Sequence, residues 1–82
     1  MSCHQRLIRA ELLPADPEGQ NEERARWAEA ALSEFRVQTG ADIEDAVSDL
    51  LADLMHWCDR HEQDFDLELQ RAQGHYEIET NS

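Results

Sequence analysis

The chain of 82 residues contains no lysine, so all seven of its basic residues are arginines. There are 19 acidic residues, and the formal net charge is -12. Binding nucleic acid through its phosphates requires a positive surface, and this chain is short of the residues that would form one. The composition therefore excludes direct nucleic-acid binding and favours partners of basic character.

Cysteine and long apolar runs are also scarce. Cys3 and Cys58 are too few for the disulfide framework of a small secreted domain, and we expect both to be thiols. No stretch approaches the roughly 18 apolar residues that span a bilayer, and the N-terminus leads into no apolar signal core. We therefore expect a cytoplasmic protein with no membrane segment.

Hydrophobic residues make up 40% of the chain, which is enough for a fold but for only a small core. The length predicts one domain over 1–82. Apolar residues recur at helical spacings, and no strand-like alternation is present. The sequence predicts an all-α protein, a small helical bundle of two long antiparallel helices with shorter N- and C-terminal helices.

The expected segments follow from turn residues and apolar spacing. They are a short helix over 2–13, a linker over 14–20, helices over 21–39, 42–61 and 64–76, and a frayed tail over 77–82. Two prolines and Gly19 disfavour regular structure in the linker, although Asp16 and Pro17 can alternatively cap the next helix one turn early. Gly40 predicts the end of helix 21–39, Asp42 is placed to cap the following helix, and Asp64 begins the last.

Helix 42–61 carries the widest apolar stripe in the sequence. Its main members are Ile43, Val47, Leu50, Leu54 and Trp57. One neighbouring helix cannot cover so wide a stripe, and short bundles commonly need a partner subunit. We expect a two-fold homodimer through this stripe, with packing inside one chain as the alternative. Trp27 is expected in the core, or alternatively as an exposed interface anchor.

The opposite side of the same helix carries a row of carboxylates. The row consists of Asp42, Asp45, Asp49 and Asp53, and His56 and Arg60 continue it. Like charges four residues apart cost a helix a few tenths of a kcal/mol per pair, so the row needs an explanation. It is either a solvated polar face or a binding site for a basic protein partner, with mimicry of nucleic acid as one form. A third interpretation is a Mg²⁺ site made by Asp45, Asp49 and Asp53.

Part of the chain resembles a known enzyme family. The run 44–54, followed by 57–60 and 64–68, resembles the second half of the MazG-like all-α nucleoside triphosphate pyrophosphatases. In that alignment Asp49 takes the aspartate position of a Glu-x-x-Asp metal motif, and Ala46 stands at its glutamate position. The resemblance implies an alternative function, a divergent nucleotide pyrophosphatase with a reduced magnesium site.

The stretch 50–76 is also similar to small all-α proteins encoded on proteobacterial plasmids and integrated elements. This similarity implies accessory cargo of a mobile element. The sequence has no phosphate-binding glycine loop, no nucleophile elbow and no zinc signature. It therefore favours a non-enzymatic interaction protein that needs no cofactor.

Overall fold

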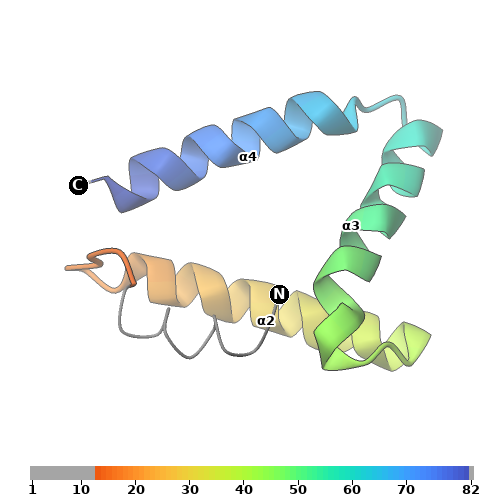
Figure 1. The fold of residues 1–82 in the computed structure, drawn as a ribbon, viewed down its shortest axis with the longest axis horizontal. Coiled ribbons are helices and arrows are strands. Elements are labelled where there is room, and N and C mark those ends of the chain that lie inside the picture. The colour runs from red at the N-terminus through yellow and green to blue at the C-terminus, as the bar shows by residue number, and fades with distance from the viewer. Residues whose placement is uncertain (1–12, 82) are drawn as a thin grey trace.

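The computed structural model describes residues 13–81, which form three helices joined by short turns (Figure 1). Helix α2 spans Gln20–Thr39, α3 spans Ile43–Arg60 and α4 spans Phe65–Thr80. These residues contain no strand, so the predicted all-α class is confirmed. The helix predicted over 2–13 lies, apart from Leu13, outside the described residues. None of the three helices is long and apolar enough to cross a membrane.

The helices form an open arrangement in which α3 links the other two. Figure 1 shows α2 and α4 running in opposite chain directions, with α3 crossing obliquely from the end of α2 to the start of α4. The Cα radius of gyration is 14.5 Å, whereas a compact domain of this length has a value of about 12 Å. The expected antiparallel pairing of helices 21–39 and 42–61 is therefore not confirmed.

A small core explains this openness. Among the described residues, the buried apolar ones are Ala46 and Cys58, near opposite ends of α3. Helical geometry places these two about 120° apart around the axis, so they mark different edges of α3. Helix α2 can bury little, because only Leu32 and Phe35 of its stripe are half-buried while its alanines are exposed.

Most of the stripe predicted for α3 remains exposed. The exposed fractions are 66% for Ile43, 56% for Val47, 40% for Leu54 and 50% for Trp57, and Leu50 is half-buried. Trp27, expected in the core, is 64% exposed. Most members of this stripe are therefore not covered by α2 or α4, which meet α3 at its two ends (Figure 1).

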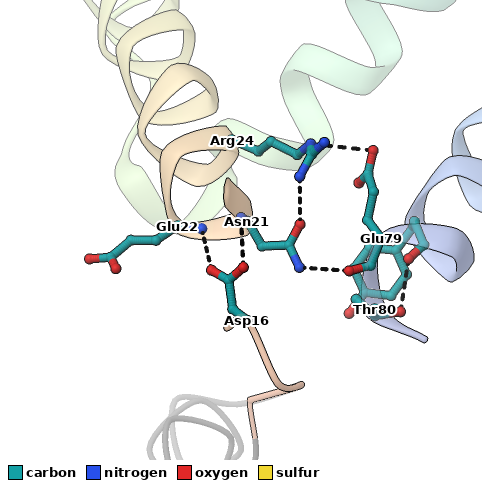
Figure 2. Close-up of polar contacts among 7 residues, drawn as sticks. Asp16, Asn21, Glu22, Arg24, Glu79 and Thr80 are labelled. Carbon is teal, nitrogen blue, oxygen red and sulfur yellow. Dashed lines mark hydrogen bonds and ion pairs between the residues drawn. The ribbon is translucent and has the colours of Figure 1, made fainter. Parts of the chain in front are cut away.

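Asp16 caps helix α2 from the preceding turn (Figure 2). Its Oδ1 accepts a hydrogen bond from the backbone N–H of Asn21 at 3.1 Å, and its Oδ2 accepts one from Glu22 at 3.0 Å. These N–H groups have no acceptor within the helix. The alternative of a cap one turn early is therefore wrong: α2 begins at Gln20 after Gly19, and Asp16 reaches its N–H groups from outside the helix.

The far ends of α2 and α4 are joined by three side chains, which we call the polar closure: Asn21, Arg24 and Glu79 (Figure 2). The Asn21 Nδ2 donates to the backbone carbonyl of Glu79 at 2.9 Å. The Arg24 Nη1 donates to the Asn21 Oδ1 at 2.9 Å, and its Nε lies 3.3 Å from the Glu79 Oε2. The polar closure thus satisfies one of the carbonyls that the C-terminal turn of α4 leaves without a helical partner.

This contact explains why the tail predicted over 77–82 is wrong. Helix α4 continues to Thr80, past Gly74, which costs the helix about 1 kcal/mol relative to alanine. Local propensity predicts fraying there, whereas the contact of Glu79 with α2 holds the last turn. The Thr80 hydroxyl also donates to the carbonyl of Tyr76 at 2.8 Å.

The other helix ends follow local signals with one exception. Gly40 adopts φ 74° and donates its N–H to the Arg36 carbonyl at 2.7 Å, which ends α2 as predicted. Asp64 caps α4 by accepting from the Leu67 N–H at 3.2 Å. Asp42 occupies the N-cap position of α3, but its side chain makes no capping hydrogen bond. The predicted side-chain cap at Asp42 is therefore wrong.

We expect Asp16→Ala and Asp64→Ala each to lower the free energy of unfolding by about 1 kcal/mol, because each carboxylate satisfies helical N–H groups. Asp42→Ala is the matched control and should cost less than half as much, because its carboxylate caps nothing. Urea unfolding followed by circular dichroism measures all three. An equal cost at Asp42 and Asp64 would contradict the capping assignment.

Candidate functional site

The carboxylates predicted to bind a partner lie on α3, where the structure leaves each of them exposed. We call these residues, together with the histidine that continues the row, the acidic face: Asp42, Asp45, Asp49, Asp53 and His56. Their spacing of three or four residues keeps them on one side of the helix. The four carboxylates extend over about 17 Å along the axis, at a rise of about 1.5 Å per residue.

None of the arginines in residues 13–81 forms an ion pair with a carboxylate of the acidic face. They are Arg24, Arg26, Arg36, Arg60 and Arg71. Three of them form ion pairs with glutamates on α2 and α4. Arg36 and Arg60 donate to backbone carbonyls, each at 3.1 Å. Arg60 stands one turn beyond His56 on the same side of α3, so the row ends at a cation, but its carboxylates form no ion pair within the described part of the chain.

The geometry of the acidic face bears on the magnesium interpretation. Asp45, Asp49 and Asp53 stand one turn apart, so the outer two are about 12 Å apart along the axis. Mg²⁺ binds oxygens at about 2.0–2.1 Å, and three carboxylates so spaced cannot all reach one ion. Within residues 13–81, no three His, Cys, Asp or Glu residues are arranged to hold a metal. A magnesium site stays a prediction and would need further ligands.

Sequence reasoning missed a stacked pair at the end of α3. The rings of Trp57 and His61 lie 4.0 Å apart between centroids, with 13° between their planes. The His61 Nδ1 is 2.9 Å from the Trp57 carbonyl oxygen. The signal was present, because residues four apart on a helix are neighbours. The stack places an imidazole beside an indole, and the nearby Cys58 thiol is buried.

A hollow of about 680 Å³ lies beside the polar closure. Its apolar wall includes Leu13, Pro14 and Tyr76. Four charged residues line it: Arg24 and Glu79 are bonded to one another, Glu22 pairs with Arg26, and the Asp16 carboxylate caps α2. The sequence could not reveal this hollow, because its residues come from the two ends of the described chain. The acidic face remains the longest row of carboxylates on one side of a helix, and none of them forms an ion pair within residues 13–81.

Asp49→Asn should raise the free energy of unfolding by about 0.5 kcal/mol at low salt, because it removes repulsion with both Asp45 and Asp53. The gain should shrink in about 0.5 M salt, which screens exposed charges. Urea unfolding at the two salt concentrations measures the effect. Glu18→Gln, outside the helices, is the control for net charge and should change little. A loss of stability on Asp49→Asn would show that this carboxylate makes a stabilising contact.

No protein-family model, no curated protein and no solved structure matches this chain. The resemblance to MazG-like pyrophosphatases and the similarity to mobile-element proteins therefore stay predictions from the sequence. The function has to be argued from the acidic face itself.

Proposed function

We propose that this protein is a non-enzymatic interaction protein whose acidic face binds a basic surface on a protein partner. The observation that carries the proposal is a row of exposed carboxylates with no arginine of residues 13–81 paired to it. The row costs the isolated helix stability. A partner that presents arginines offsets this cost, because arginine and carboxylate form strong charge-assisted hydrogen bonds.

The spacing of the carboxylates describes the surface that would fit. One carboxylate falls every 5–6 Å or so along α3, which suits a partner whose arginines are one helical turn apart. Mimicry of nucleic acid is a narrower form of the proposal, in which the partner's basic groove normally holds DNA or RNA. One strand of DNA carries a phosphate about every 3.4 Å, so the acidic face is a sparser line of charge than the strand it would replace.

The mobile-element setting implied by the sequence makes a cytoplasmic accessory role part of the proposal. The partner is then a basic protein of the host or of the element. Long-range attraction between opposite charges speeds such an encounter and weakens as salt is added. Salt dependence is therefore the signature of this face.

Partner capture tests the proposal. The wild-type protein and a triple variant, Asp45→Asn, Asp49→Asn and Asp53→Asn, are immobilised and exposed to host lysate in about 50 mM salt. We expect the wild type to retain a basic protein that the variant loses, with at least a tenfold difference in the dissociation constant once the retained protein is purified. Binding should weaken steeply by about 300 mM salt.

The matched control carries the same change of net charge at exposed positions elsewhere: Glu18→Gln, Glu29→Gln and Glu77→Gln. It should bind like the wild type. Equal binding by the acidic-face variant would contradict the proposal, and equal loss in the control would reduce it to an effect of net charge. Competition by a duplex DNA or RNA fragment for the partner would support mimicry, and its failure would leave basic-surface binding without mimicry.

A further inference from the structure

Helix α3 has a second exposed surface, which we call the apolar face: Ile43, Val47, Leu50, Leu51, Leu54 and Trp57. A helix turns about 100° per residue, so all six members lie within an arc of about 120° around its axis. The buried residues Ala46 and Cys58 lie towards the edges of this arc. Helices α2 and α4 therefore cover edges of α3 and leave the middle of the apolar face open.

The exposed area has the size that a protein–protein interface requires. An aromatic side chain presents about 150–250 Å². With the lower value for the aliphatic residues and the upper one for Trp57, the exposed fractions on α3 amount to roughly 450 Å². A standard interface buries about 800 Å² on each partner, of which about 60% is apolar, or roughly 500 Å². A patch of this size is at the upper end of what monomers expose.

Residues 13–81 also bury little apolar surface for a stable monomer. None of the described residues is a large side chain that is fully buried. Domains of this size rarely obtain enough stability from a single small core and often obtain the rest by oligomerisation. Because the folded chain needs this stabilisation at all times, the partner that supplies it has to be always present. A second copy is the one partner that is present at equal concentration at all times.

We infer that the apolar face of α3 packs against the same face of a second copy, forming a two-fold homodimer whose folding and association are coupled. A two-fold axis pairs one patch with itself, so no second type of surface is needed. The acidic face lies roughly 120° around the helix from the apolar face. Pairing therefore leaves both acidic faces in solvent, where their repulsion is screened beyond about 8 Å in physiological salt.

This inference concerns a different surface from the proposed function and does not rest on it. The two surfaces should also respond oppositely to salt. Added salt weakens the binding of a basic partner, whereas it strengthens pairing between two chains that each carry a net charge of -12. A failure of one proposal can therefore be told from a failure of the other.

Light scattering coupled to size exclusion tests the dimer from about 1 to 200 μM in about 0.15 M salt. We expect a mass near 19 kDa, twice the 9.5 kDa of one chain. Thermal unfolding of the wild type supplies a test that needs no variant. Its midpoint should rise by about 5–10 °C over a hundredfold increase in concentration, because association stabilises the folded state. A single-chain mass with full helicity and a constant midpoint would overturn the inference, as would a trimer.

Val47→Glu places a charge in the middle of the apolar face, at a residue already 56% exposed in one chain. We expect it to weaken association at least a hundredfold and to lower helicity at micromolar concentration. Val37→Glu is the matched control, because Val37 lies on α2 and is 79% exposed. It should keep the dimer mass. An unchanged mass for Val47→Glu, or equal dissociation by Val37→Glu, would show that this face is not the interface.

Discussion

The polar closure between the start of α2 and the end of α4 fixes how the three helices are arranged. Asn21 and Arg24 both bond to Glu79, and these contacts join residues 58 and 55 positions apart in the chain. The closure is partly exposed, with side-chain exposures of 41% for Arg24 and 29% for Glu79. An ion pair in such a setting contributes about 0–1 kcal/mol. The polar closure therefore orients α4 relative to α2 but adds little to the free energy of unfolding. It lies away from α3 and leaves most of that helix's apolar surface exposed.

Features that depend on neighbouring residues could be predicted from the sequence. Apolar spacing predicted α2, α3 and most of α4, and Gly40 and Asp64 marked helix ends because their effects are local. The last turn of α4 could not be predicted, because Glu79 is held by residues at the other end of the chain. The oblique path of α3 was missed for a related reason: spacing shows which face is apolar and leaves open which neighbour covers it.

The same distinction holds for the candidate site. The positions of Asp45, Asp49 and Asp53 on one side of a helix follow from their spacing alone. That the arginines of residues 13–81 are engaged elsewhere does not follow from the sequence, since Arg24 pairs with a residue of α4. Helix α3 thus presents two surfaces of opposite character, one charged and one apolar, with enough angular separation for both to be occupied at once. A dimer would carry two acidic faces, which suits a partner with repeated basic sites.

The reactivity of Cys58 reports local opening of the structure where α3 turns into α4. The residue is 6% exposed, and its carbonyl accepts a hydrogen bond from the Gln63 N–H at 2.9 Å in the turn into α4. A buried thiol is protected from an alkylating reagent, so alkylation at Cys58 requires local opening of the structure around it. When the open state closes again faster than the reagent attacks, the alkylation rate of Cys58 divided by that of an unfolded thiol equals the equilibrium constant for opening. The alkylation rate of one side chain thereby gives the free energy of local opening between α3 and α4.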